Sequence, residues 1–454
     1  MIYQKFEIKN FQGIGSLEID LSNNRIVTLV GLNESGKTTI LQAILLFYKL
    51  LHGNEPDERQ LNKFRPKGIE FSGDVEIYGE LYFEDHDLER IQNKWHEHNP
   101  DVDLSIPRTF SFKYVFNYEL HAYKGTNRTC IFQAMIDGTD KLLCFENEHQ
   151  WQELITFIKS ELVPEIIFYD DFIYEFPEHI QFTINQTPQQ AKANPKNEKW
   201  QLVMDDLLKS ANPQLSFQEH VVNLWATDND LAENRISQIE RELNKKITHA
   251  WRSLFNNGIK KRNFKEIQLR CNFQTNILTI SFLIKTETDE VYLISERSKG
   301  FRWYFAFLIS TEFRKNRAKN ILFLLDEPAS YLHPSAQVKV LEAIEGLSEN
   351  AFVIYTTHSH HMINPNWLSS TYVVVDELLL DDEAGQEGVL KEKAKIQAIK
   401  YNKYINSDAA LNNASSHWAI SDALKIKSTG SISNINDKTA NPLSSLTQKL
   451  FMKN

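Results

Sequence analysis

A glycine-bounded loop constrains the fold of this chain more than any other feature. Residues 31–38 read GLNESGKT, between a short β-branched run (residues 26–30) and an apolar run of helical character (residues 39–51). The loop fits the pattern G-x-x-x-x-G-K-[ST], in which backbone N–H groups curl around phosphate and a helix N-terminus adds positive potential. The pattern therefore predicts an α/β fold with a phosphate site, and the alternative is a glycine-rich turn that binds nothing.

The loop pattern also assigns roles to side chains. Lys37 would reach the β and γ phosphates of ATP, and the Thr38 hydroxyl would ligate Mg²⁺. The residues expected to touch the nucleotide are those of the loop and the first helical turn: Asn33, Glu34, Ser35, Gly36, Lys37, Thr38 and Thr39.

A second candidate site follows an apolar run far along the chain. Residues 321–325 read ILFLL, predict a buried strand, and are followed by Asp326, Glu327 and Pro328. In a parallel sheet, ligands bind beyond the carboxyl ends of the strands. Asp326 would hold Mg²⁺ through water, and Glu327 would orient or deprotonate an attacking water. The alternative is a helix N-cap with a second carboxylate on the helix dipole.

A histidine follows the next predicted strand. Residues 352–357 read FVIYTT, and His358 comes directly after them. At the strand end, His358 would hydrogen-bond the γ-phosphate. Two other interpretations stay open: an ordinary surface or core histidine, and a metal site shared with His360 and His361. The close sequence spacing of the three disfavours a shared metal, and His360 and His361 receive no role.

The hydrophobic pattern divides the chain into four parts. Residues 70–175 alternate apolar and polar residues and predict an antiparallel sheet with one wet face. A polar stretch at 185–200 predicts a linker, residues 201–258 have a helical period, residues 267–294 predict strands, and residues 295–375 alternate helix and strand. We expect an N-terminal part (1–184), a linker and helical insertion (185–266), a C-terminal part (267–383) and a polar tail (384–454).

Composition excludes several classes of protein. The net charge of −10 argues against a general coat of positive charge for binding nucleic acid. Three cysteines without a C-x-x-C spacing disfavour a disulfide framework and a zinc site, and favour a reducing cytoplasm. The start lacks a signal-peptide pattern, and no apolar run approaches the roughly 20 residues that span a bilayer. We expect a cytoplasmic protein without membrane contact.

Two charged clusters have alternative interpretations. The basic run of Lys260, Lys261, Arg262 and Lys265 could contact nucleic-acid phosphates, but a solvated helix end is the preferred interpretation. An acidic cluster is preferred as a solvated loop over a nuclease centre, because its members gather in one short segment: Asp376, Glu377, Asp381, Asp382 and Glu383.

The order of these motifs resembles the ABC-type ATPases of the SMC and RecF class, and more closely the OLD-like ATPases of bacterial anti-phage systems. The segments that carry the resemblance are residues 5–11 (KFEIKNF), 31–38, 326–337 (DEPASYLHPSAQ) and 356–359 (TTHS). The resemblance implies an α/β, ABC-type head with a parallel sheet, an antiparallel β subdomain and a short helical insertion, with ATP and Mg²⁺ as cofactors.

The family signature is altered in this chain. Residues 294–303 (ISERSKGFRW) stand where the family has L-S-G-G-Q. By resemblance, Ser298 and Gly300 would touch the γ-phosphate held by a second copy; a register at Ser295 and a plain helix N-cap are the alternatives. Asp170 and Asp171 stand at about the place of the family's magnesium-contacting glutamine.

The resemblance also implies a partner. The chain is similar to the ATPase subunits of the Septu system, which pairs with an HNH nuclease, and of the PARIS system, which pairs with a TOPRIM protein. It implies a homo-oligomer with ATP between its heads that regulates or scaffolds a nuclease or toxin in antiviral defence, with nucleic acid engaged through the complex. The alternatives are a RecF-like DNA-repair ATPase and a non-hydrolysing scaffold.

Overall fold

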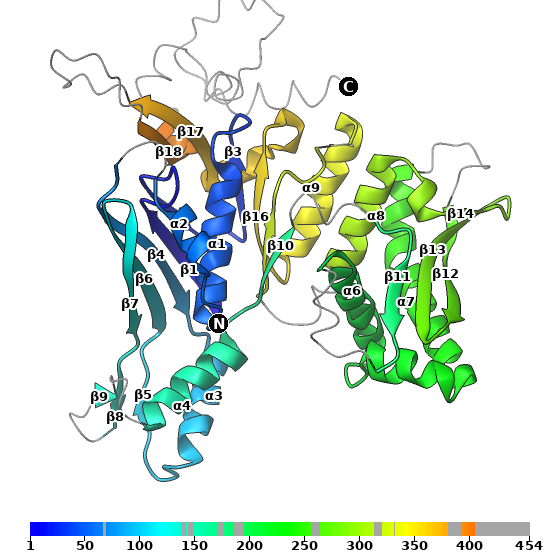
Figure 1. The fold of residues 1–454 in the computed structure, drawn as a ribbon, viewed down its shortest axis with the longest axis horizontal. Coiled ribbons are helices and arrows are strands. Elements are labelled where there is room, and N and C mark those ends of the chain that lie inside the picture. The colour runs from blue at the N-terminus through cyan, green and yellow to red at the C-terminus, as the bar shows by residue number, and fades with distance from the viewer. Residues whose placement is uncertain are drawn as a thin grey trace, which may run out of the picture. The chain divides into compact units, whose positions relative to one another are not determined.

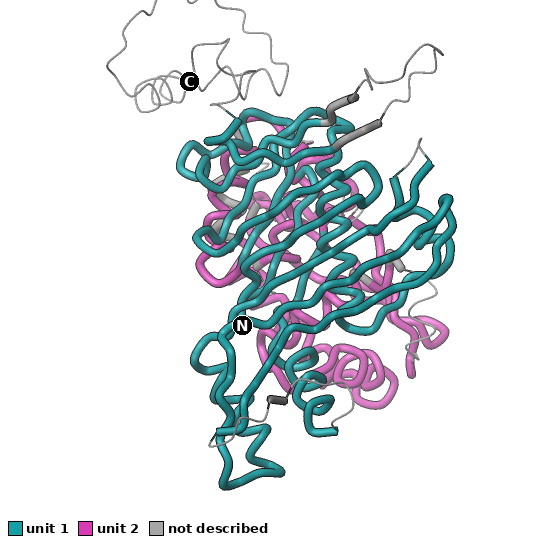
Figure 2. The backbone as a smooth tube through the Cα atoms, turned by 90° about the vertical axis from the view of Figure 1, so that its left-hand side faces the viewer, with its two compact units in different colours: residues 1–168, 320–327, 352–454 teal, residues 169–319, 328–351 magenta. Residues whose placement is uncertain are grey.

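The computed structural model describes ten stretches of the chain (Figure 1). They are residues 1–66, 70–137, 142–143, 149–169, 176–185, 195–255, 264–312, 320–330, 332–379 and 393–404. The chain divides into two compact units, coloured separately in Figure 2. Unit 1 comprises residues 1–168, 320–327 and 352–454, and unit 2 comprises residues 169–319 and 328–351.

Unit 1 contains an antiparallel sheet of order β2-β1-β4-β6-β7. Its strands are β1 (Ile2–Lys9), β2 (Ser16–Asp20), β4 (Gly73–Tyr82), β6 (Thr109–Glu119) and β7 (Ala122–Ile131). Along β4, every second residue from Val75 to Leu81 is buried, because successive side chains point to opposite faces of a sheet. The alternating pattern thus predicted the antiparallel sheet correctly.

A second sheet of unit 1 has the order β10-β15-β16-β3-β17-β18. Its strands are β10 (Ile166–Tyr169), β15 (Leu322–Leu325), β16 (Phe352–Thr357), β3 (Ile26–Val30), β17 (Thr371–Leu379) and β18 (Lys393–Lys400). The pairs β15–β16, β16–β3 and β3–β17 are parallel, and β17–β18 is antiparallel. Every residue of β3, β15 and β16 is buried, as expected for parallel strands covered on both faces.

Two sequence expectations about these sheets were wrong. The run that forms β10 was expected in the antiparallel sheet, but it belongs to the six-stranded sheet. Alternation identifies a strand without naming its partner. Residues 384–454 were expected to be a polar tail, yet the described part of this range, residues 393–404, forms β18 and the short helix α10 (Tyr401–Tyr404). Its buried residues Ile396, Tyr401 and Tyr404 are too sparse to stand out in a polar composition.

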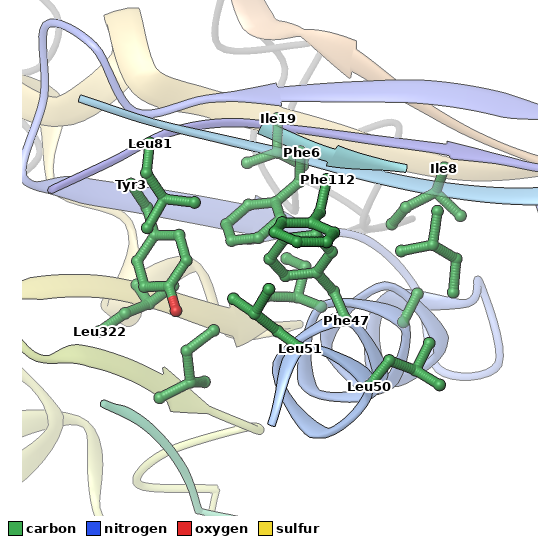
Figure 3. Close-up of a cluster of buried hydrophobic side chains, with 14 of the residues drawn as sticks. Tyr3, Phe6, Ile8, Ile19, Phe47, Leu50, Leu51, Leu81, Phe112 and Leu322 are labelled. Carbon is green, nitrogen blue, oxygen red and sulfur yellow. The ribbon is translucent and has the colours of Figure 1, made fainter. Parts of the chain in front are cut away.

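Helix α1 (Lys37–Leu51) packs into one core with both sheets of unit 1. Its apolar residues recur at helical spacing, so Ile40, Ile44 and Phe47 lie on one buried stripe. Figure 3 shows Phe47 of α1 beside Phe6 of β1 and Phe112 of β6. The Phe47 ring meets the Phe6 ring edge-on, with centroids 5.6 Å apart. This packing fixes the helix that begins at the phosphate loop.

Shorter elements complete unit 1. They are α2 (Glu58–Phe64), α3 (Asp85–His96), β5 (Leu104–Ser105), β8 (Ala134–Ile136), β9 (Leu142–Leu143), α4 (His149–Phe157), η1 (Ile158–Leu162), η7 (His360–Met362) and η8 (Pro365–Ser370). The start of α2 is fixed by a capping box, in which Asp57 accepts from the Gln60 N–H and the Gln60 side chain accepts from the Asp57 N–H.

Unit 2 has a sheet of order β11-β13-β12, with β14 also paired to β13. Its strands are β11 (Ile180–Thr183), β12 (Phe264–Gln274), β13 (Ile277–Thr286) and β14 (Val291–Leu293). Its helices are α6 (Pro195–Ala211), η3 (Gln218–Val222), η4 (Asn223–Ala226), α7 (Asn229–Phe255), η6 (Ile294–Glu296), α8 (Lys299–Glu312) and α9 (Pro334–Ser348). The helical period expected over residues 201–258 is seen in α7, where Ile236, Ile239, Leu243 and Ile247 are buried.

Three further expectations concern single segments. Helix α6 begins at Pro195, so the end of the expected polar linker (185–200) is helical. Cys130 and Cys271 are not joined in a disulfide, and Cys144 lies outside the described residues. Among the helices that the structure describes, none is long and apolar enough to cross a membrane.

Candidate active site

The phosphate loop connects β3 to α1 as the sequence predicts. Gly36 stands at the N-cap of α1 with a φ of 94°, a left-handed conformation that favours glycine. No side chain among the described residues caps this helix and its first turn has no acidic residue, so its first N–H groups are left for another acceptor. Ser35 Oγ is also buried without a hydrogen-bond partner among the described residues. An anion such as a phosphate fits these donors.

Lys37 links this loop to the end of β15. Its side chain is 4% exposed, and its Nζ donates to the carbonyls of Gly31 (3.0 Å) and Leu32 (2.6 Å). The same Nζ lies 3.3 Å from Glu327 Oε1. Burial lowers the pKa of Lys37, and the Glu327 carboxylate opposes this shift. The charged ammonium is therefore held in a confined place beside both the loop and a carboxylate.

Asp326 is held by two hydroxyl groups from different elements. Thr38 Oγ1 donates to Asp326 Oδ2 (2.8 Å), and Thr356 Oγ1 donates to Asp326 Oδ1 (2.7 Å). Burial raises the pKa of Asp326, while the hydrogen bonds from Thr356 and Thr38 oppose the rise. A hydroxyl and a carboxylate are the oxygen ligands that Mg²⁺ prefers. The structure thus brings together the two residues expected at the metal, although they are far apart in sequence.

Glu327 occupies the centre of the site in a strained conformation. Its φ of 46° is left-handed, which costs a non-glycine residue roughly 1 kcal/mol or more. Its N–H donates to Thr356 Oγ1 (2.7 Å), and its carboxylate lies between Lys37 and His358. His358 Nδ1 is 3.1 Å from Glu327 Oε2, within ion-pair distance but outside hydrogen-bond geometry. Both side chains remain partly exposed, so water can reach them.

Thr356 belongs to the site, although it received no role from the sequence. It donates to Asp326 and accepts from the Glu327 backbone, so one hydroxyl positions both acidic residues. The parallel register pairs Leu325 with Tyr355, which places Asp326 and Thr356 next to each other at the carboxyl ends of their strands. The sequence does contain a signal for this role: when the apolar runs of β15 and β16 are aligned, Thr356 stands one position beyond them, next to Asp326.

The remaining residues singled out in the sequence occupy varied positions. Asn33 and Glu34 are exposed, and Glu34 has a left-handed φ of 66°. Thr39 is half-buried in the first turn of α1. His360 and His361 lie in η7 with ring centroids 3.8 Å apart. Asp170 and Asp171 lie outside the described residues.

The signature residues belong to unit 2. Ser298 precedes α8, and its Oγ accepts from the Phe301 N–H (3.3 Å), which is the N-cap arrangement kept as an alternative for this serine. Gly300 lies in the first turn of the same helix. Ser295 lies in η6, and its carbonyl accepts from Arg302 Nη1 (3.3 Å).

The two charged clusters differ from their preferred interpretations where they are described. Lys265 lies in strand β12 and forms an ion pair with Asp289 (2.9 Å), so it does not end a helix. Asp376 and Glu377 lie in β17 and not in a loop. Lys260, Lys261, Arg262, Asp381, Asp382 and Glu383 lie outside the described residues.

Comparisons with known proteins place the site in context. The chain is 42% identical over 94 residues to the uncharacterized protein MJECL43 of Methanocaldococcus jannaschii; the match covers 20% of this chain and 24% of that protein. The chain therefore spans about a quarter of the length of the curated relative it matches.

Two solved structures of SMC heads are similar in outline. An SMC head bound to the C-terminal winged-helix domain of ScpA gives a TM-score of 0.46 at 15% identity, over 90% of this chain and all of that one. The second structure is an SMC head with an extended coiled coil, bound to the C-terminal domain of ScpA, from Pyrococcus furiosus. It gives a TM-score of 0.42 at 15% identity, and the match covers 91% of this chain and all of the SMC chain.

A family model described as AAA ATPase domain matches residues 1–363. The matched region contains the phosphate loop, both acidic residues at the end of β15, and His358. Because the match covers well over half of the chain, the protein belongs to the AAA ATPase domain family.

Proposed function

We propose that the chain binds ATP with Mg²⁺ and hydrolyses it. The observation that carries the proposal is the gathering of Lys37, Thr38, Asp326 and Glu327 within unit 1, with Thr38 and Asp326 joined at 2.8 Å. The loop N–H groups and Lys37 would hold the phosphates, and Thr38 and Asp326 would hold the metal ion. Magnesium ATP would supply the phosphoanhydride bond that water cleaves.

Glu327 is proposed to orient and deprotonate the attacking water, with His358 beside it. In the structure, Lys37 Nζ donates hydrogen bonds to two loop carbonyls and forms an ion pair with Glu327. When Lys37 turns to an anion in the loop, the Glu327 carboxylate loses this cation and keeps His358 as its neighbour. The freed carboxylate oxygen would then accept a hydrogen bond from the attacking water.

The test compares the wild type with Glu327→Gln. We expect the variant to bind ATP with near wild-type affinity. Its rate of hydrolysis should fall by about 100-fold or more, because the general base is lost. Glu342→Gln is a matched control, since Glu342 lies on α9 and pairs with Lys339 (2.8 Å). Equal, negligible turnover by wild type and Glu327→Gln would instead support the non-hydrolysing scaffold.

We further propose that two copies close around ATP, with Ser298 and Gly300 of each copy facing the loop of the other. Support comes from the motif resemblance and from the position of Ser298 and Gly300 at the N-terminus of α8, where anions bind favourably. Light scattering of Glu327→Gln with ATP should show a dimer, and Ser298→Arg should remain monomeric while still binding nucleotide. Dimers of Ser298→Arg would argue against this arrangement.

A role beside a nuclease or toxin in antiviral defence is the finer proposal, and its support is the resemblance to Septu and PARIS ATPase subunits. It predicts that phage protection needs an HNH or TOPRIM reading frame next to the gene. The rival RecF-like role predicts that DNA stimulates ATP turnover by the purified chain. Strong stimulation by DNA, with no need for a neighbouring gene, would favour the rival.

A further inference from the structure

The phosphate loop is contacted by a strand beyond the region that the family model matches. That strand is β18, which pairs with β17 in the register Asp376 to Ile396. On its other edge, the Ile396 N–H donates to the Gly13 carbonyl (2.8 Å), and the Ile396 carbonyl accepts from the Gly15 N–H (3.4 Å). Strand β18 is therefore held at both edges, by its pairing with β17 and by the two hydrogen bonds that Ile396 makes to Gly13 and Gly15.

The Ile396 side chain lies against two glycines. A Cβ placed on Gly36 would be only 2.3 Å from Ile396 Cδ1, and a Cβ placed on Gly13 would be 2.9 Å from the same atom. Real Cβ atoms do not approach other carbon atoms so closely, so both positions depend on the missing side chain. Ile396 is 7% exposed and belongs to the same core cluster as α1.

The loop around Gly13 and the strand β18, which hold Ile396, are themselves fixed by hydrogen bonds and an ion pair. Around Gly13, the Asn10 N–H donates to the Gly15 carbonyl (2.9 Å), and the Gln12 N–H donates to the Phe64 carbonyl (2.6 Å). Further along β18, Lys400 forms an ion pair with Asp20 of β2 (3.0 Å). The backbone at Ile396 thus cannot shift away from Gly36 without breaking several of these contacts.

We propose that Ile396 is a positioning residue for the nucleotide site. By filling the space over Gly36, it holds that residue in its left-handed conformation and keeps the first N–H groups of α1 aimed at the phosphate position. Its contact sets the affinity for ATP without touching ATP. This inference rests on the proposed function, because it assumes that the loop binds a nucleotide.

The first experiment shortens the side chain. We expect Ile396→Ala to weaken Mg²⁺-ATP binding roughly tenfold, raising KM while kcat stays within about threefold, because the loop loses pre-organisation but keeps its chemical groups. Ile396→Val, which keeps part of the contact, should recover most of the affinity. Ile399→Ala is the control, since Ile399 packs with a separate cluster formed by Val373, Tyr401 and Tyr404. Thermal unfolding without nucleotide checks that each variant folds.

The second experiment acts from the far side of Ile396. Gly13→Ala adds a methyl group that pushes Ile396 towards Gly36, so it should weaken ATP binding although Gly13 is outside the phosphate loop. Combining Gly13→Ala with Ile396→Val should restore part of the affinity, and this non-additive result would support direct packing. Folded Ile396→Ala and Gly13→Ala variants that bind ATP like the wild type would overturn this inference alone. A wild type that binds no ATP would overturn the proposed function together with it.

Discussion

The hydroxyl of Thr38 donates a 2.8 Å hydrogen bond to the carboxylate of Asp326, 288 positions further along the chain. This bond joins the start of α1 to the end of β15. Both ends stay in place because β15, β16 and β3 are neighbours in one sheet whose parallel registers carry the two motifs to the same edge. The two side chains proposed to hold the metal ion are therefore in direct contact.

Replacing Lys37 should remove nucleotide binding. We expect Lys37→Ala to lose at least about 100-fold in affinity for ATP, because the buried ammonium lies against the carbonyls of the phosphate loop and beside Glu327. Lys49→Ala is the control, since Lys49 lies exposed in the last turn of the same helix. Isothermal titration calorimetry measures both variants. Full affinity in Lys37→Ala would refute the assignment of the loop.

Replacing Asp326 should stabilise the protein while removing its response to Mg²⁺. Burial raises the pKa of Asp326 in the folded state, so its stabilising contribution is complete at low pH and is lost as the pH rises through the raised pKa. At pH 7, which is well above the unfolded value, this contribution is reduced, so the carboxyl group is a net cost to stability. We therefore expect Asp326→Asn to raise the free energy of unfolding by about 1 kcal/mol without nucleotide.

The control for this prediction is Asp289→Asn. Ion pairs and hydrogen bonds with Lys265 and Lys285 lower the pKa of Asp289, so this change should not stabilise the fold. Chemical denaturation at pH 7 and ATP titrations with and without Mg²⁺ provide the measurements. A less stable Asp326→Asn variant, or one that keeps its Mg²⁺ dependence, would contradict the prediction.

Thr356→Val keeps the shape of the side chain but removes the hydroxyl that serves both acidic residues. Asp326 Oδ1 loses a donor and the Glu327 N–H loses an acceptor, so we expect the free energy of unfolding to fall by about 1–3 kcal/mol. ATP hydrolysis should slow, because Glu327 is no longer held in its left-handed conformation. Thr356→Ser should restore both properties. A fully active Thr356→Val variant would show that this hydroxyl does not position Glu327.

The ion pair that anchors β18 should respond to acid. Burial tends to raise the pKa of Asp20, but hydrogen bonds from Ser22 and Lys400 outweigh it and lower the pKa to about 2. A lowered pKa gives stability that is complete above the unfolded value, about 3.9, and is lost as the pH falls through about 2. Asp20→Asn should cost about 1 kcal/mol at pH 7.

Denaturant unfolding of wild type and Asp20→Asn at several pH values tests this sign. The difference between the two proteins should shrink as the pH falls from about 4 towards 2. Lys400→Met should reduce the same difference at pH 7, because Lys400 provides one of the hydrogen bonds. A difference that does not change with pH would mean that Asp20 does not lose an ion pair in this range.

Strongly periodic segments could be predicted from the sequence, and long-range contacts could not. The strand and helix around the loop were expected at 26–30 and 39–51 and are found at Ile26–Val30 and Lys37–Leu51. Local pattern and loop chemistry are sufficient there. The partner of β10, the strand β18 and the role of Thr356 depend on which strands become neighbours, and neither periodicity nor composition contains that information.

Glu327 shows the same difference between what the local sequence predicts and what depends on long-range packing. Its place after a buried strand marked it as a candidate, and the structure puts its carboxylate between Lys37 and His358. Its left-handed φ has no local signal, and the threonine that supports it can be recognised only once β15 and β16 are aligned as neighbours. The sequence could indicate which residues belong to the site, while the strain within it becomes visible only in three dimensions.

The neighbours of β3 have a consequence for how the protein is made. This strand is complete once the first 30 residues exist, but it pairs with β16 on one side and β17 on the other, and both lie beyond residue 351. On the ribosome, the earliest-made strand of the sheet must therefore wait for most of the chain before either of its edges is covered. A prematurely terminated polypeptide would leave an apolar strand with two open edges, which is a substrate for chaperones and a starting point for aggregation.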